Sequence, residues 1–173
     1  MTRLFARFVS FGCLLAFLVS VGLLLFYAID INAFADLARQ NLALAIDWKT
    51  VVAAQWYSLW ILSAVYLAIG LVGLFFLHRA FTKFARGEFF NESNSRDLRL
   101  FAVLLFVQAL AKPIHYSLAS VLLSLNHLPG QRLLSISFGS FELKVIVLAM
   151  VLWVISDMLV RGRELEHENQ QFV

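Results

Sequence analysis

Three side chains that could do chemistry lie in apolar stretches of the chain. Lys112 and His115 belong to one hydrophobic run, which also contains Pro113, and Glu142 stands near the start of the next. Proline removes a backbone hydrogen bond and bends a helix, and a lysine inside a membrane costs about 2.5–3.5 kcal/mol unless it reaches the interface or finds a partner. At about 1.5 Å of rise per residue, Lys112 and Glu142 fall in the same half of the bilayer. The sequence therefore predicts an ion pair between Lys112 and Glu142.

Two interpretations of this polar group stay open at this point. In the first, the bent helix and its polar side chains line a site for a small molecule or an ion. In the second, Lys112 extends to the membrane surface and His115 makes a hydrogen bond to another helix. The chain has one cysteine, and its four histidines are far apart, so we expect no metal site and no cofactor. The sequence has no phosphate loop, zinc-binding helix or nucleophile elbow, so we expect no enzyme.

Composition indicates which elements hold these residues. The 173 residues are 61% hydrophobic and 14% charged, whereas about 25% of the residues in a soluble domain are charged. The apolar residues are concentrated in four blocks, each near the length of about 20 residues that crosses a bilayer. These blocks cover about residues 8–29, 56–77, 98–123 and 138–160. We therefore exclude an ordinary soluble enzyme and predict an all-α integral membrane protein with four transmembrane helices in one domain, residues 1–173.

Lysine and arginine are unequally distributed between the two ends of these helices, and in membrane proteins the cytoplasmic side carries the excess. One side has nine and the other has three. The first set is Arg3, Arg7, Arg79, Lys83, Arg86, Arg96, Arg99, Arg161 and Arg163, and the second is Arg39, Lys49 and Arg132. We predict an antiparallel N-in/C-in bundle with both termini in the cytoplasm. In the alternative, residues 8–29 belong to a cleaved signal peptide, because Ala33-Phe34-Ala35 has the form of a cleavage site.

Two smaller features complete the predicted layout. The first outer loop has apolar residues spaced seven, four and three positions apart. This spacing predicts a short amphipathic helix that lies on the outer face of the membrane. These residues are Leu37, Leu44, Trp48 and Val51. Asp157 lies about one turn from the inner end of the last span, so we expect an ion pair with Arg7 or Arg99 at the interface.

Two segments on the predicted cytoplasmic side carry a distinctive pattern. The inner loop has the spacing Gly-Glu/Lys-x-Phe-x-x-x-Asn-x-x-x-Leu-Arg, formed by Gly87, Glu88, Phe90, Asn94, Leu98 and Arg99. The tail pattern is formed by Arg161, Leu165, Glu168, Asn169 and Val173. Gly162 is one position nearer to Arg161 than the tail pattern requires. With the four-span layout, both segments resemble the small bacterial membrane proteins called domain of unknown function 2975.

The resemblance implies a location and a kind of partner rather than a reaction. It places the chain in the inner membrane of a bacterium. Members of that family accompany small helix-turn-helix regulators, which implies that the chain holds, or senses for, a cytoplasmic DNA-binding protein. Both segments, together with Arg96, would then form the docking surface, and the partner alone would contact nucleic acid. The alternative function is a small transporter or ligand-sensing subunit that uses Lys112, His115 and Glu142. Self-association as a homo-oligomer is compatible with either function.

Overall fold

The computed structural model describes the backbone of residues 2–87, 92–127, 130 and 132–171, and the side chains of these residues except 2 and 163–171. The described backbone forms five α-helices and one short 3-10 helix, and it contains no strand. The elements are α1 (Thr2–Ile29), α2 (Ile31–Asn41), η1 (Trp48–Thr50), α3 (Ala53–Arg86), α4 (Glu92–Ser124) and α5 (Ser140–Gln171). The prediction of an all-helical chain is confirmed.

Four of these helices are long and apolar enough to cross a membrane: α1, α3, α4 and the part of α5 up to Gly162. Large apolar side chains on their outer faces are exposed, including Phe8 at 74%, Val65 at 62% and Met158 at 64%. In water such faces would have to be covered, whereas lipid solvates them. The chain is therefore a multi-pass membrane protein with four candidate spans.

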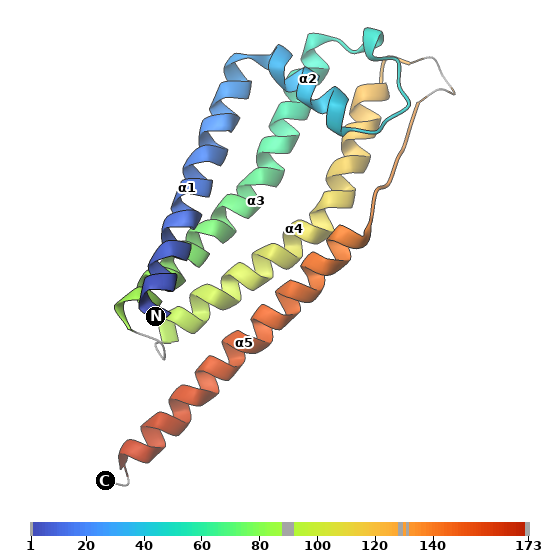
Figure 1. The fold of residues 1–173 in the computed structure, drawn as a ribbon. Helices are drawn as coiled ribbons and strands as arrows, with labels where there is room; N and C mark the ends of the chain where they lie inside the picture. The colour runs from blue at the N-terminus through green and yellow to red at the C-terminus, as the bar shows by residue number, and fades with distance from the viewer. Residues whose placement is uncertain (1, 88–91, 128–129, 131, 172–173) are drawn as a thin grey trace.

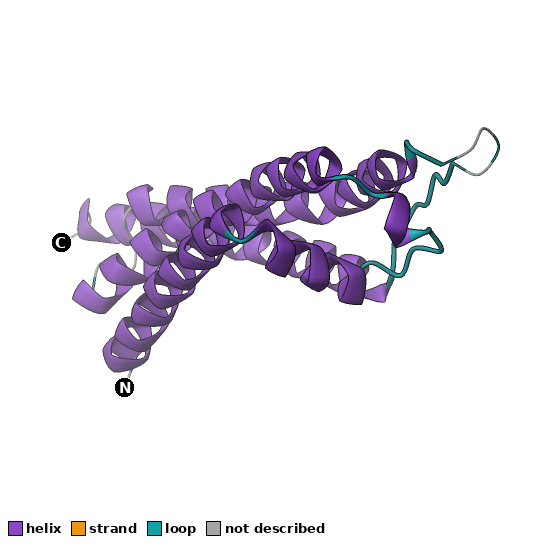
Figure 2. Cartoon of the chain, turned by 90° about the horizontal axis from the view of Figure 1, so that it is seen from above, coloured by secondary structure: helices purple, strands orange, loops and turns teal. Residues whose placement is uncertain are grey.

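The four long helices form an open row rather than a closed bundle. Among the described residues, α1 packs on α3, α3 on α4 and α4 on α5, and α1 and α5 make no comparable contact. The row is visible in Figure 1, and Figure 2 shows most of the loop segments at the end away from both termini. A bundle need not close in a membrane, because lipid covers helix faces that protein does not.

Both chain termini and the α3–α4 connection lie at one end of the row (Figure 1), which we call the basic end. Its described side chains include Arg3, Arg7, Arg79, Lys83, Arg86, Arg96, Arg99 and Arg161. The opposite end carries α2, η1 and the α4–α5 connection. This arrangement matches the predicted antiparallel order of spans, and the side of the membrane that the basic end faces stays a prediction.

The connection at the basic end is shorter than predicted. The sequence suggested a loop from 78 to 97, but α3 continues to Arg86 and α4 begins at Glu92. Gly87 ends α3 in the left-handed conformation, with a φ of 90°, and its N–H bonds to the carbonyl oxygen of Phe84. Both helices extend past the apolar blocks, because a helical backbone can keep its hydrogen bonds at the membrane interface as well as in lipid. Hydropathy therefore locates the apolar part of each helix but not its first and last residues.

The fourth span also begins later than predicted, at Ser140 instead of residue 138. Residues 132–139 form no helix and run beside the far end of α4 (Figure 1). Two serines of α4 bind this segment: Ser124 Oγ accepts the N–H of Leu133 at 3.0 Å, and Ser120 Oγ accepts the N–H of Ser135 at 2.9 Å. Both serines are fully buried. Their hydroxyls supply partners that an extended backbone needs in apolar surroundings.

The first outer loop contains a helix, α2, but of the four residues on which the prediction of an amphipathic helix rests only Leu37 belongs to it. α2 ends at Asn41, and Leu37 is 40% exposed. The buried residues of α2 are Phe34, Ala35 and Ala38, which pack with Trp56 and Leu59 of α3 and with Ala119 and Leu123 of α4. The face of α2 that is buried is therefore determined by contact with the ends of α3 and α4. The spacing of the apolar residues from Leu37 to Val51 does not identify that face. That the helix lies on a membrane surface stays a prediction.

Candidate functional site

The ion pair predicted between Lys112 and Glu142 is present and joins α4 to α5. The Lys112 ammonium contacts Oε1 of Glu142, and Oε2 accepts the N–H of Gly139 at 2.7 Å. The Glu142 side chain is 4% exposed and that of Lys112 is 40% exposed. Glu142 lies in the first turn of α5, where the positive end of the helix dipole favours a carboxylate. Both of its oxygens therefore have partners in the apolar part of the molecule.

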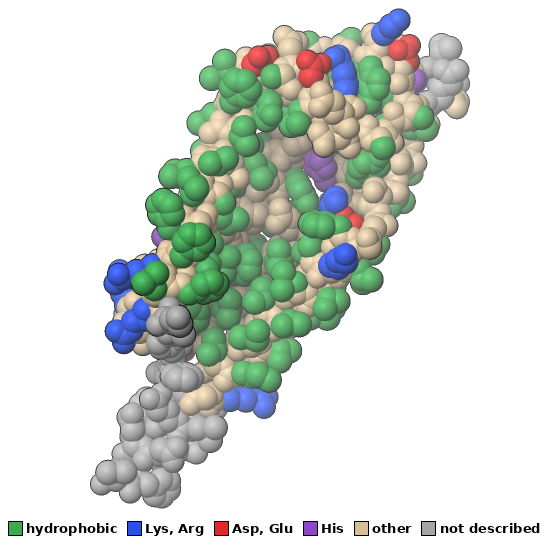
Figure 3. All heavy atoms as spheres, in the orientation of Figure 1, with side chains coloured by type: hydrophobic (Ala, Val, Ile, Leu, Met, Phe, Trp, Pro, Cys, Tyr) green, Lys and Arg blue, Asp and Glu red, His purple; other side chains and the backbone are tan. Residues whose placement is uncertain are grey.

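A small cavity of about 170 Å³ adjoins this pair between three helices. Its polar lining comes from Tyr66 of α3, Gln108 of α4 and the Lys112–Glu142 pair. A Cβ on Gly70 would lie only 2.7 Å from Nε2 of Gln108, so α3 and α4 approach closely here. In Figure 3 a small group of charged side chains and a histidine interrupts the hydrophobic middle of the visible face. The cavity therefore offers polar and charged groups to a ligand inside an otherwise apolar region.

The other two residues of the predicted intramembrane site have different surroundings. His115 Nε2 lies 3.1 Å from Ser63 Oγ, and the imidazole lies 5.0 Å from the Tyr66 ring, so His115 connects α4 to α3. It does not line the cavity. Pro113 lies inside α4, and Figure 1 shows α4 changing direction along its length, as a proline that removes a backbone hydrogen bond would produce.

A second group of charges lies at the basic end, and the sequence did not predict it. Asp97 of α4 is fully buried, and its Oδ2 accepts hydrogen bonds from Arg79 Nε at 2.9 Å and Lys83 Nζ at 2.7 Å. Lys83 also donates to the hydroxyl of Ser93. Arg79 and Lys83 are four residues apart and thus share one face of α3. The four-residue spacing of these two cations, together with an acid after the connection to α4, is the pattern from which the sequence could have predicted this group. We call Arg79, Lys83, Ser93 and Asp97 the Asp97 cluster.

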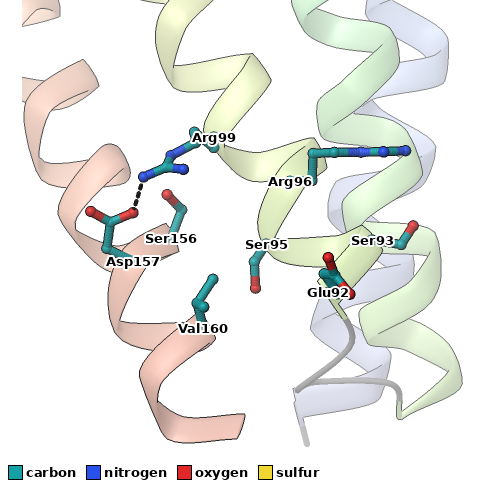
Figure 4. A pocket seen from close by; sticks show the side chains of 8 residues that line it. All are labelled: Glu92, Ser93, Ser95, Arg96, Arg99, Ser156, Asp157 and Val160. Atoms are coloured by element: carbon teal, nitrogen blue, oxygen red, sulfur yellow. Dashed lines mark hydrogen bonds and ion pairs between the residues drawn. The ribbon is translucent and has the colours of Figure 1, made fainter. Parts of the chain in front are cut away.

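The third charged group is the pair predicted for Asp157. Arg99 Nη2 lies 2.5 Å from Asp157 Oδ1, and the guanidinium carbon lies 4.9 Å from the Trp153 ring centre. The Arg99 and Asp157 side chains are 47% and 41% exposed. Figure 4 shows the two side chains pointing toward each other across the gap between α4 and α5. This pair therefore joins two helices without being sealed from its surroundings.

A cleft of about 580 Å³ opens beside the Arg99–Asp157 pair. Ser95 and Arg96 line it from the first turns of α4, and Ser156 and Asp157 line it from α5. Ser95 and Ser156 are 4% and 1% exposed, so their hydroxyls belong to the wall of the cleft and not to the open surface. The sequence did not predict a role for either serine, because a serine in a helix does not indicate which residues of a neighbouring helix it faces.

The structure divides the predicted docking residues into three sets. Asn94 is fully buried, so a partner cannot reach its side chain, and the expectation that it docks one is wrong. Gly87 forms the turn after α3, and Arg3 lies over it. Arg96 and Arg161 are exposed, whereas Arg99 pairs with Asp157. Glu88 and Phe90 lie outside the described residues, as do the side chains of Leu165, Glu168 and Asn169.

The described residues contain no group of three or more His, Cys, Asp or Glu side chains placed to hold a metal ion. The family model described as "Protein of unknown function (DUF2975)" matches residues 41–173. The match includes both segments on which the resemblance rests, together with α3, α4 and α5. No curated protein and no solved structure matches the chain.

Proposed function

We propose that this chain, which belongs to the DUF2975 family of proteins of unknown function, is a non-enzymatic docking module that holds a cytoplasmic partner at its basic end. One observation carries the proposal. α5 continues as a helix from the end of its candidate span at Gly162 to Gln171, beyond the ends of the other helices (Figure 1). This projecting segment is rich in charge, unlike the apolar span before it. A charged helix held outside a membrane is a surface that a soluble protein can bind.

The charge of the basic end supports a cytoplasmic location for that surface. Lysine and arginine are retained on the cytoplasmic side during insertion, which favours both termini in the cytoplasm of a bacterial inner membrane. The described cations of this end outnumber its described acids. A partner with an acidic patch would therefore be steered toward Arg96 and Arg161, and this attraction would weaken as salt screens it. The projecting part of α5 carries Arg163 against Glu164, Glu166 and Glu168, so it favours basic groups on the partner.

The partner that we propose is a small DNA-binding regulator of the helix-turn-helix kind. The family resemblance supports this choice. Because Asn94 is buried and Gly87 is part of a tight turn, the contact is assigned to the projecting part of α5 and to the exposed Arg96 and Arg161. The partner would make all contacts with DNA, and the membrane protein would control how much of it is free to do so.

The test is recovery of the partner from native membranes in mild detergent, with its identity established by mass spectrometry. The full chain should recover a small DNA-binding protein, whereas a chain that ends at Gly162 and an Arg161→Glu variant should not. Arg39→Glu, which reverses an exposed charge at the opposite end, is the matched control and should recover it fully. Recovery of no DNA-binding protein by the full chain, or equal recovery by the shortened chain, would overturn the proposal.

A second function is favoured by the cavity beside Lys112 and Glu142. Ionisable side chains inside a membrane are typical of ligand or ion pathways, and here they meet the first turn of a helix that begins beside an extended segment. The function would be that of a small transporter or ligand-sensing subunit. Lys112→Met should abolish it and leave partner recovery unchanged, whereas Arg161→Glu should do the reverse.

A further inference from the structure

We propose that the cleft between α4 and α5 at the basic end binds the phosphate-bearing headgroup of an anionic lipid. The cleft has a volume of about 580 Å³, within the range of about 300–1,000 Å³ that is usual for small-molecule sites. It lies against the first turns of α4 and near the end of the α5 candidate span. That is the level at which headgroups meet a transmembrane helix. The cleft does not include the projecting part of α5, and Arg96 is the residue that it shares with the surface to which we assign the protein partner.

Ser95 supplies the observation that points to a ligand. Its side chain is 4% exposed and lines the cleft, yet its hydroxyl makes no hydrogen bond to any described residue. Ser95 Oγ is not among the fully buried polar atoms that lack a partner, so this hydroxyl is reached from the cleft, where water or a ligand satisfies it. Figure 4 shows Ser95 on the face of α4 that borders the cleft. A phosphate oxygen in the cleft would accept the hydrogen bond that this hydroxyl can donate.

Arg99 supplies the charge. It lies one helical turn after Ser95, so the two side chains share a face of α4. A guanidinium has five N–H donors, and Asp157 is the only carboxylate within ion-pair distance of Arg99 among the described side chains. When a phosphate takes the place of Asp157, these donors can bind it in the planar, forked geometry that arginine favours. Arg96 also borders the cleft, although Figure 4 shows its side chain extending away from α5.

Two carboxylates border the same cleft and oppose an anion, Asp157 and Glu92. Asp157 holds Arg99, so a phosphate must compete with Asp157 for the guanidinium. The described cations of the basic end outnumber its described acids, and the cleft lies at the N-terminal end of α4, where the helix dipole favours negative charge. Binding is therefore an exchange in which Arg99 changes one anionic partner for another.

A lipid is a better occupant than a free anion because apolar surface adjoins the cleft. On α5, Val154, Met158 and Val160 are 51%, 64% and 39% exposed, so acyl chains can lie along this helix while the headgroup enters the cleft. Trp153 lies against Arg99 at the same level, and tryptophan is enriched where lipid headgroups begin. A free phosphate would gain only the polar contacts.

The test measures apparent dissociation constants by native mass spectrometry of the full chain in detergent. The probes are dioctanoyl phosphatidylglycerol, which is anionic, dioctanoyl phosphatidylcholine, which is zwitterionic, and inorganic phosphate. We expect phosphatidylglycerol to bind most tightly. Arg99→Gln should weaken its binding about fivefold, and Ser95→Ala should weaken it roughly threefold. Asp157→Asn should tighten it about fivefold, because Arg99 no longer has a competing carboxylate.

Asp36→Asn is the matched control, since it removes an exposed aspartate from an arginine pair at the opposite end and should leave lipid binding unchanged. Ser95→Ala keeps the test decisive if Arg99→Gln fails to fold, because the Ser95 hydroxyl makes no bond within the described chain. Equal binding by all variants, or weaker binding by Asp157→Asn, would overturn the proposal. Inorganic phosphate that bound as tightly as phosphatidylglycerol would overturn the assignment to lipid.

Discussion

The two charged groups of the basic end contain the same residue types but differ in what surrounds them. Asp97 is fully buried between Arg79 and Lys83, whereas Asp157 is 41% exposed and faces only Arg99 among the described side chains. The first group closes α3 onto α4, and the second joins α4 to α5 beside an open cleft. Burial, more than charge, therefore separates a group that holds the fold from one that can exchange partners.

The Lys112–Glu142 pair combines features of both groups. Its acid is nearly buried and its base is 40% exposed, next to a cavity much smaller than the cleft at the basic end. The contrast between closed and open groups thus gives an order of expected effects. Stability should depend most on Asp97, less on Lys112 and Glu142, and least on Asp157.

The largest loss of stability is expected for Asp97→Asn. The substitution keeps the shape of the side chain but leaves two cations without a buried counter-charge, and breaking a buried pair in this way costs about 3 kcal/mol. Denaturation of the purified protein by increasing amounts of sodium dodecyl sulfate in mild detergent measures the change. Asp36→Asn, in an exposed pair, is the control and should change the unfolding free energy by less than about 0.5 kcal/mol. If Asp97→Asn lowered the unfolding free energy no more than the control does, burial would not determine the order of effects among the charged groups.

Lys112→Met should have the next largest effect, about 2 kcal/mol, because it leaves the nearly buried Glu142 without its cation. Adding Glu142→Gln should recover most of this loss. Glutamine keeps an oxygen that can accept the Gly139 N–H but carries no charge. The same denaturation measurement on both single variants and the double variant gives the coupling between the two residues. A double variant as unstable as the sum of the two singles would contradict a direct pair.

Contacts set by depth in the membrane could be predicted from the sequence, whereas contacts set by helix rotation could not. Lys112 and Glu142, and likewise Arg99 and Asp157, occupy equal depths in neighbouring spans, and rise per residue is enough to place them together. The Asp97 cluster requires the rotation of α3 against α4 as well as depth. Hydropathy does not contain that rotation, because lipid-facing and protein-facing sides of a span are equally apolar.

Loop structure was the other part that the sequence left undetermined. Ser120 and Ser124 bind the extended segment before α5, yet serines four residues apart are common in membrane helices and do not indicate an extended partner. Asn94 belongs to the segment that resembles the family, and its burial shows that a motif residue can serve the fold rather than a surface. Side-chain burial is set by tertiary packing, which a single sequence states only indirectly.

Gly87→Ala tests whether the turn or the Asp97 cluster sets the approach of α3 to α4. The φ of 90° is unfavourable for alanine, and the new Cβ would lie 2.8 Å from Nη2 of Arg3, a flexible group that can move. We expect a loss of about 1 kcal/mol from the backbone conformation alone. Gly12→Ala, a helical position with no neighbour within 4 Å, is the control and should be neutral or stabilising. If Gly87→Ala lowered the unfolding free energy as much as Asp97→Asn does, the turn would determine how α3 approaches α4.

Asp157→Asn should have the smallest effect on stability, about 0.5 kcal/mol or less, because half-exposed ion pairs contribute little. It is the same chemical change as Asp97→Asn at the same end of the molecule, so the two variants differ chiefly in burial and in the number of cations affected. The measurement is the free energy of unfolding of both variants in detergent without added lipid. If Asp157→Asn lost as much as Asp97→Asn, the Arg99–Asp157 pair would be a structural lock, and an anion could not displace Asp157 without loosening α5. If it lost almost nothing, α5 would be held by its other contacts with α4, including the Lys112–Glu142 pair, and Arg99 would be free to change partners while the fold stayed intact.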